Sequence, residues 1–235
     1  MMLTDFELEA LHLSLKVAFY AVLWLTPISV IIAWVLARKS FWGKSAFDAC
    51  IHLPLVLPPV VIGYLLLVGM GRQGIIGKWL FDTFGIVFSF DWKGAVLASA
   101  VVSLPLMVRA IRLSIESIDT KLEQVARSLG ATPMRVFFTI TLPLALPGVI
   151  TGALLAFARS LGEFGATISF VSSIPGETQT LPLAMYSFIE TPGAEHEAAR
   201  LCVISIIVAL VSLLISEVLS KKANQKIGLT SRVSK

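Results

Sequence analysis

The sequence predicts an all-α membrane protein, a bundle of five transmembrane helices with the N-terminus outside and the C-terminus inside the cell. Three observations lead to this prediction. Hydrophobic residues make up 56% of the 235 residues and charged residues only 14%, well below the roughly one quarter of a soluble domain. Uncharged stretches long enough to cross a bilayer occur five times along the chain. Basic residues gather on alternate connecting segments.

The first predicted span covers residues 11–37. The segment before it holds Asp5, Glu7 and Glu9 and no Lys or Arg, unlike a signal peptide, so we expect this span to be retained. The other spans are predicted at residues 47–70, 92–112, 137–161 and 198–219, within one transmembrane domain, residues 1–235.

Two connections between these spans are long. Residues 113–136 are expected on the cytoplasmic side and residues 163–197 on the external side. Residues 164–189 are apolar enough to suggest a sixth span, but Glu177, the pair Pro175-Gly176 and Pro182 interrupt them. We therefore expect an external loop, part of which could re-enter the membrane.

The basic residues set the orientation. Thirteen of the 19 Lys and Arg residues follow the first span, lie between the third and fourth spans, or follow the fifth span. Such residues concentrate on the cytoplasmic side of membrane proteins. Topology thus accounts for the net charge of +4, so we expect a lipid bilayer and no nucleic acid as partner.

Two helices that are predicted to run from the cytoplasmic to the external side share a Leu-Pro-Leu-x-Leu-Pro pattern, at residues 53–58 and 142–147. Proline is tolerated in a first helical turn, but a second proline four residues later should kink or loosen the helix. The pattern predicts a broken helix start, either a hinge that lines a passage or a kink that neighbouring helices accommodate. Gly148 and Gly152 should allow another helix to approach closely.

The connection at residues 113–136 contains signals for two short helices. Thr120 and Glu123 have the spacing of a capping box, which predicts a helix start. Gly130 predicts the end of that helix in a left-handed cap, and Thr132-Pro133 predicts the start of the next one.

One face of the first short helix is apolar: Leu122, Val125, Ala126 and Leu129 recur at helical spacing. On a cytoplasmic surface such a face needs a cover. Either a partner protein supplies it or the face packs against the chain's own helices.

The sequence contains no constellation for catalysis. The three histidines are isolated, and the glycine-rich stretch 71–79 has Trp79 where a phosphate loop requires Ser or Thr. Cys50 and Cys202 lie in apolar runs without zinc or disulfide spacing, so we expect them to be small core residues. We expect no enzymatic activity, no cofactor and no metal site.

A few polar residues lie within the predicted spans, where they are costly. Arg159 and Glu163 are four residues apart and either pair with each other or, with Glu163 holding Arg159, contribute to an anion passage. Hydroxyl groups are further candidates for weak anion contacts, although many bond the carbonyl four residues back. These candidates are Ser29, Ser99, Ser103, Thr151 and Ser205.

The connection also resembles the EAA loop of ABC importer permeases, in which Glu-Ala-Ala is followed by Gly, Ile and Leu-Pro at fixed spacing. Here Gln124-Val125-Ala126 stands in place of Glu-Ala-Ala, with Glu123 just before it. The later positions are kept at Gly130, Ile140 and Leu142-Pro143. The resemblance implies an ATPase-coupling loop formed by Glu123, Gln124, Val125, Ala126, Leu129, Gly130, Ile140, Leu142 and Pro143.

Nearly the whole chain resembles the permease subunits of bacterial molybdate transporters, including residues 53–63, 104–112 and 158–167. The resemblance implies a type I ABC importer permease fold in the bacterial inner membrane and alternating access by a homodimer. It also implies two cytoplasmic ATPase subunits and a periplasmic molybdate-binding protein as partners. Sulfate/thiosulfate and tungstate permeases look similar around residues 162–175, so these cargoes remain alternatives, as does a passive anion channel.

Overall fold

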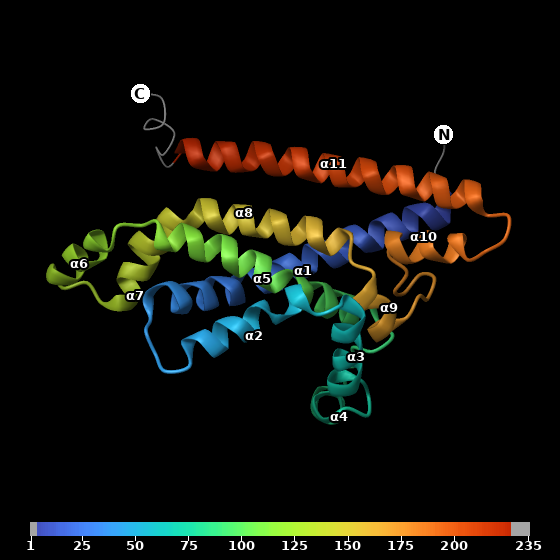
Figure 1. Ribbon diagram of the computed structural model, residues 1–235, viewed down its shortest axis with the longest axis horizontal. Helices are drawn as coiled ribbons and strands as arrows, with labels where there is room; N and C mark the ends of the chain where they lie inside the picture. The colour runs from blue at the N-terminus through green and yellow to red at the C-terminus, as the bar shows by residue number, and fades with distance from the viewer. Residues whose placement is uncertain (1–3, 227–235) are drawn as a thin grey trace.

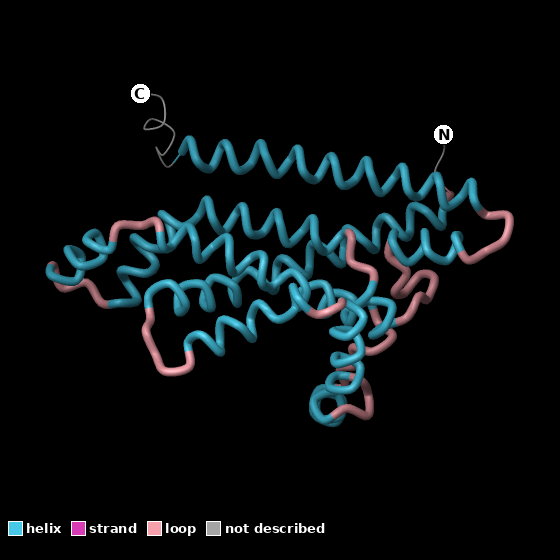
Figure 2. Tube along the Cα trace, viewed as in Figure 1, coloured by secondary structure: helices cyan, strands magenta, loops and turns pink. Residues whose placement is uncertain are grey.

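The computed structural model describes residues 4–226, and every regular element in that range is a helix (Figures 1 and 2). Four helical stretches are long and apolar enough to cross a membrane. They are α1 (Asp5–Arg38), α5 (Trp92–Glu116), the run α7 (Pro133–Val136), η1 (Phe137–Thr141) and α8 (Leu142–Leu161), and the first part of α11 (Glu195–Lys226). A bent pair, α2 (Lys44–Val56) and α3 (Pro59–Met70), can form a fifth span. The all-α prediction is confirmed, with four or five candidate spans.

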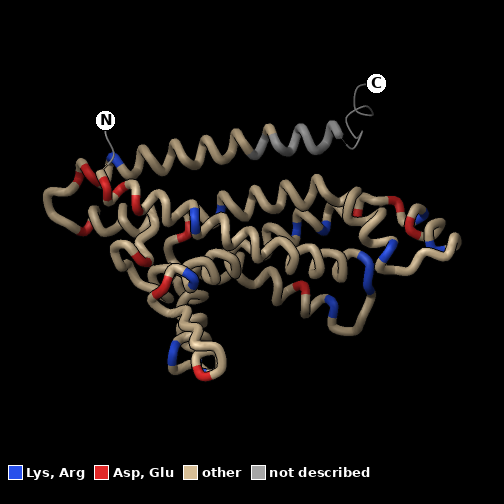
Figure 3. The backbone as a smooth tube through the Cα atoms, turned by 180° about the vertical axis from the view of Figure 1, so that it is seen from behind, with Lys and Arg blue, Asp and Glu red and all other residues tan. Residues whose placement is uncertain are grey.

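The long helices α1, α5, α8 and α11 run along the long axis of the molecule (Figure 1). Charged residues gather near the two ends of this bundle and on α4 (Ile75–Phe84), while most of the middle is uncharged (Figure 3). An apolar middle between charged ends is expected of a membrane-spanning bundle. The orientation stays a prediction, and two residues on which it rests, Arg232 and Lys235, lie outside the described residues.

The centre of the bundle is α5, which packs against α1 on one side and α8 on another. Met107, Val108 and Ile111 of α5 have no exposed surface. A Cβ added at Gly152 of α8 would lie 3.1 Å from the backbone oxygen of Met107, and one at Gly148 would overlap the Ser114 side chain. The predicted close approach at both glycines is therefore confirmed.

The two proline patterns fold differently. In the first, α2 ends at Val56, Leu57 is extended, and α3 starts after a bend of 114°. Proline disfavours helical geometry in the residue before it, which explains the extended Leu57 before Pro58. In the second, α8 continues through Pro147, so the predicted break is absent there. The irregularity comes earlier instead, as the π-helical turn η1 directly before α8.

The predicted external loop, residues 163–197, needs correction because much of it is helical. It contains α9 (Gly165–Val171) and α10 (Leu181–Ile189), connected by residues 172–180. Phe170 and Val171 of α9 are fully buried, and α9 packs against α3 and α5. α10 packs against α1 and α11, so both short helices belong to the folded bundle.

Two smaller features complete the fold. α3 and α4 project from the side of the bundle, while α6 (Thr120–Ser128) lies at one end of it (Figure 1). Cys50 and Cys202 are exposed, so their predicted place in the core is wrong. Both lie on outer helices, α2 and α11, whose apolar surfaces would face lipid or a second subunit.

Candidate functional site

The first short helix of the connection, α6, starts one residue earlier than predicted. Asp119 is its N-cap, and the Asp119 carboxylate accepts a hydrogen bond from the Lys121 amide at 2.9 Å. Thr120 is therefore the first helical residue, and the Glu123 side chain does not accept a hydrogen bond from the backbone at the start of the helix. The predicted capping box is wrong because Asp119 supplies the cap and Glu123 binds elsewhere.

Glu123 is buried, with 6% of its surface exposed. Its Oε1 accepts hydrogen bonds from Nε of Arg38 at 3.0 Å and from Oγ1 of Thr141 at 2.9 Å. The Arg38 guanidinium also donates to the Ile118 carbonyl at 3.1 Å. One carboxylate thus joins the last residue of α1, the helix α6 and the last residue of η1.

The turn after α6 has the predicted form. Gly130 has φ +84°, and the amides of Gly130 and Ala131 donate to the carbonyls of Arg127 and Ala126 at 2.9 and 3.0 Å. These two bonds form a Schellman motif, which requires a left-handed residue. Thr132 then caps α7, accepting from the Arg135 amide at 3.4 Å, with Pro133 as the first helical residue.

The apolar face of α6 is uncovered. Leu122 is 50% exposed, Val125 59% and Leu129 83%, and Ala126 is half-buried. Packing of this face against the chain's own helices, one of the two alternatives, does not occur in the described residues. Gln124 is also exposed, whereas Ile140 lies in η1 and Leu142 and Pro143 open α8.

At the opposite end of α8, Arg159 and Glu163 form the predicted ion pair, with NH1 2.8 Å from Oε2. The Glu163 side chain is 1% exposed, and its other oxygen accepts from the Ala166 amide at 2.8 Å in the first turn of α9. Glu163 therefore fixes both Arg159 and α9. The Arg159 side chain keeps 31% of its surface exposed, which leaves part of the guanidinium open to an anion.

The predicted pathway hydroxyls fall into different environments. Ser103 of α5 lies 3.0 Å from Ser160 of α8, oxygen to oxygen, in a buried contact. Ser29 and Ser99 are buried, and their hydroxyl oxygens have no protein partner. Thr151 is exposed on α8. Among the candidate hydroxyls whose hydrogen bonds are described, only that of Ser103 contacts a hydroxyl on a neighbouring helix.

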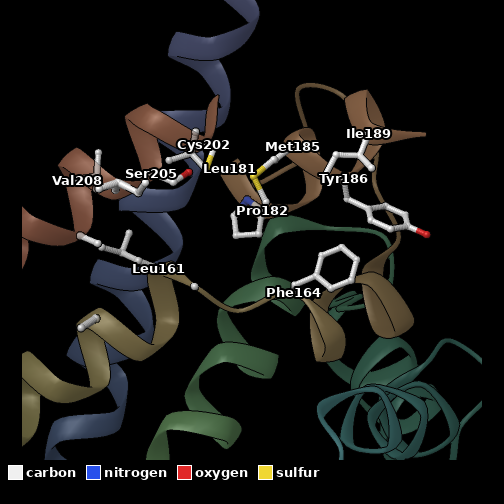
Figure 4. Close-up of a pocket in the computed structure, with 14 residues that line it drawn as sticks. Leu161, Phe164, Leu181, Pro182, Met185, Tyr186, Ile189, Cys202, Ser205 and Val208 are labelled. Atoms are coloured by element: carbon white, nitrogen blue, oxygen red, sulfur yellow. The ribbon is translucent and has the colours of Figure 1, made fainter. Parts of the chain in front are cut away.

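Ser205 lies in a largely apolar cavity of about 520 Å³ between α8, α10 and α11 (Figure 4). Its hydroxyl donates to the Leu201 carbonyl at 2.8 Å, the back-bond common in helices. Tyr186 lies at the rim, and its hydrogen bond to Glu190 raises the pKa of Tyr186. An apolar cavity does not favour an oxyanion, so Ser205 is the weakest of the pathway candidates.

A polar cavity that the sequence did not indicate lies between α2 and α5, and its volume is about 320 Å³. Arg112 contacts Glu116 at 2.8 Å and Asp48 at 3.0 Å, so two carboxylates neutralise it. Arg109 lines the same cavity, and within residues 4–226 it has no ion pair. His52 also lines the cavity, with its Nδ1 2.9 Å from the Asp48 carbonyl oxygen. The contact between α2 and α5 could not be predicted from the sequence. The spacing of Arg109 and Arg112, three residues apart on one helix, was a signal that both side chains lie on the same face.

Comparisons with known proteins agree with this architecture. The family model described as "binding-protein-dependent transport system inner membrane component" matches residues 26–224. The chain is 66% identical over 222 residues to the molybdenum transport system permease protein ModB of Haemophilus influenzae, covering 94% of this chain and 97% of that protein. It is 64% identical over 228 residues to the Escherichia coli K12 protein of the same name, covering 97% and 100%.

Solved structures share the fold at low sequence identity. A bacterial ABC transporter for import of alginate matches with a TM-score of 0.74 at 17% identity, covering 94% of this chain and 80% of that chain. The inward-facing MetNI methionine ABC transporter matches with a TM-score of 0.67 at 15% identity, covering 92% and 94%. Because the family model and the ModB relatives each match most of the chain, it belongs to the family of binding-protein-dependent transport system inner membrane components.

Proposed function

We propose that this chain is the permease subunit of an ATP-driven importer that carries molybdate across the bacterial inner membrane. It works as a homodimer, with two separate ATPase subunits on the cytoplasmic side and a periplasmic molybdate-binding protein outside. The observation that carries the proposal is 64–66% identity over 94–97% of the chain to proteins named as molybdenum transport permeases. In this proposal ATP is hydrolysed by the separate ATPase subunits, and the chain serves as the transport subunit.

The exposed face of α6 supports the contact with the ATPase. Leu122, Val125 and Leu129 form an apolar surface at one end of the bundle, beside the rigid turn at Gly130. Burying such side chains in a cleft of a partner is favourable by about 1.5–3 kcal/mol for each leucine fully covered. Each copy of α6 would sit in one ATPase subunit.

The mechanism that follows is alternating access. Closure of the ATPase pair on ATP draws the two α6 helices together and opens the path outward, and hydrolysis returns the path to the inward-open state. By linkage, a docked binding protein must in turn favour closure of the ATPase pair.

The path has to pass a tetrahedral dianion that is costly to desolvate. Weak, successive contacts meet this need better than one tight site. Arg159, partly exposed beside Glu163, and the buried pair of Ser103 and Ser160 are candidates toward one end. Ser29, Ser99 and Thr151 remain further candidates, and Arg109 offers a cation toward the α6 end.

Other oxyanions are alternative cargoes, and an uptake assay distinguishes them from molybdate. A probable sulfate transport system permease protein of Chlorella vulgaris is 35% identical over 87% of this chain, so sulfate is a specific alternative. Tungstate and thiosulfate are others. A passive anion channel would not need an ATPase at all.

The decisive experiment reconstitutes the chain with its ATPase and binding protein in proteoliposomes. We expect uptake of labelled molybdate only with ATP and the binding protein, competition by tungstate, and little competition by sulfate. Sulfate competing as well as tungstate would overturn the choice of cargo. Anion flux through the purified chain alone, without ATP, would support the channel.

A further inference from the structure

α6 is held to the membrane bundle by a single buried side chain. Of residues 120–128, Glu123 is the only buried one, while Leu122, Gln124 and Val125 are exposed. The rest of α6 therefore offers little contact surface to the bundle. Apart from its backbone connections, the helix is tied to the bundle through the Glu123 carboxylate.

The partners of that carboxylate lie on two different membrane helices. Arg38 is the last residue of α1, and Thr141 is the last residue of η1, immediately before α8. Both bonds reach the same oxygen, Oε1, at 3.0 and 2.9 Å. Arg38 also holds the Ile118 carbonyl, which lies just before α6. A displacement of α6 must therefore act on the ends of α1 and α8 together.

The ion pair is well shielded, with side-chain exposures of 12% for Arg38 and 8% for Glu123. A shielded pair loses solvation, so it is a poor way to gain stability compared with apolar side chains of similar size. Its advantage is geometric, because a charge-assisted hydrogen bond fixes distance and direction. That property suits a joint that transmits movement between rigid helices.

We propose that Glu123 is a positioning residue through which movement of α6 is transmitted to α1 and α8. The inference rests on the proposed function, in that α6 is the element an ATPase moves. Gln124, at the acidic position of the EAA pattern, faces outward toward the ATPase, while Glu123, one residue earlier, faces inward toward the bundle. The two neighbours thus divide the tasks of docking and transmission.

The test compares two threonines of η1 in the complete transporter. Thr141→Val removes the hydroxyl that donates to Glu123. Thr139→Val makes the same change two residues away, where the exposed hydroxyl only bonds the Arg135 carbonyl at 2.6 Å. The quantities measured are the ATPase subunit retained on purification, the rate of ATP hydrolysis, and the anion taken up per ATP hydrolysed.

We expect Thr141→Val and Glu123→Gln to retain the ATPase subunit and hydrolyse ATP, but to lower anion uptake per ATP at least about fivefold. Thr139→Val should match the wild type. The double variant should be no worse than Glu123→Gln alone, because both changes weaken the same joint: Gln keeps an accepting oxygen but loses the charge, and Val loses the donating hydroxyl. Uptake per ATP within twofold of wild type in Glu123→Gln and Thr141→Val would overturn the proposal.

A second measurement needs no partner protein. Spin labels are placed at the exposed residues Ile31 of α1 and Gln124 of α6, with Cys50 and Cys202 replaced by Ala. We expect a narrow distance distribution that broadens in Glu123→Gln and stays narrow in Thr139→Val. An unchanged distance distribution in Glu123→Gln would refute the proposal that Glu123 couples α6 to α1 and α8. Absence of ATP-dependent uptake by the wild type would refute the proposed function and leave this result standing.

Discussion

Arg200, in the first turns of α11, forms an ion pair with Glu7, in the first turn of α1, although 193 residues separate them. The Glu7 side chain is 1% exposed, and its second oxygen accepts from the Thr4 amide at 2.8 Å. Nearby, the Ser14 hydroxyl oxygen accepts from the Leu181 amide at 2.7 Å, which ties α10 to α1. These contacts close the bundle at the end opposite α6.

This pair predicts a loss of stability when one partner is removed. Breaking a buried pair costs about 3–5 kcal/mol, and because Arg200 is partly exposed we expect about 2 kcal/mol for Arg200→Gln. The measurement is denaturant unfolding in detergent. Lys93→Gln is the control, since its contact with Asp91 is 3.9 Å long and exposed. Equal stability of the two variants would contradict the prediction.

Replacing Gly130 tests the turn. At φ +84° a side chain strains the backbone by about 1–2 kcal/mol, although a Cβ there would meet no atom within 4 Å. We expect Gly130→Leu to insert normally but to uncouple ATP hydrolysis from uptake. Gly130→Asn should retain coupling, because asparagine tolerates the left-handed conformation. Normal uptake by Gly130→Leu at wild-type abundance would count against the coupling role.

Leu129→Ala tests the contact with the ATPase. The side chain is 83% exposed, so truncation should not destabilise the chain itself. Loss of its burial in a complex amounts to about 1–2 kcal/mol, or roughly a 5- to 30-fold weaker affinity for the ATPase subunit. Titration binding assays would measure this change. Leu210→Ala, 54% exposed on α11, should leave the affinity unchanged.

Arg159 distinguishes an anion contact from a local ion pair. If Arg159 contacts the cargo, Arg159→Gln should raise the KM for anion uptake several-fold, and Arg159→Lys should restore most of it because the charge is kept. Thermal stability should also fall in Arg159→Gln, because the buried Glu163 loses its guanidinium partner as Glu7 does in Arg200→Gln, so the KM and its rescue by lysine are the readouts that distinguish the roles. A wild-type KM with a lowered melting temperature would instead assign the residue to holding Glu163 and α9.

The contact of α5 with α8 predicts the result of adding one methyl group. Gly148→Ala should destabilise the chain by about 1–3 kcal/mol, because the new Cβ would overlap Ser114. Gly162→Ala, where nothing lies within 4 Å of a Cβ, should stay within about 0.5 kcal/mol of the wild type. Unfolding in detergent compares the two, and a larger loss at Gly162 would be inconsistent with the packing described.

The features predicted well from the sequence were those set by near neighbours. Gly130, Thr132 and Pro133 act through residues within five positions, and the pair of Arg159 and Glu163 lies within one helical turn. The apolar face of α6 could also be read from its spacing, because helix periodicity is local. The long uncharged runs likewise gave four of the spans.

What could not be predicted depends on contacts between distant segments. Glu123 was expected to cap its own helix, but a guanidinium 85 residues away, at Arg38, is a stronger partner than a backbone amide. The bend between α2 and α3 was foreseen, yet its direction depends on packing of α3 against α9. The sequence does not predict helices α9 and α10, because Pro175-Gly176, Glu177 and Pro182 interrupt the apolar run in which both helices lie.

The π-helical turn η1 has one more residue than an α-helix would use for the same number of turns. Deleting a single residue between Phe137 and Thr141 would allow an uninterrupted α-helix from α7 into α8. Each residue of an α-helix turns the chain by about 100°, so four α-helical residues make nearly the same rotation as the five of η1, and everything before the deletion would keep its direction about the α8 axis. The leucines of α6 would then keep their direction relative to the membrane, whereas α-helical geometry over all five residues of η1 would turn them by about 100°.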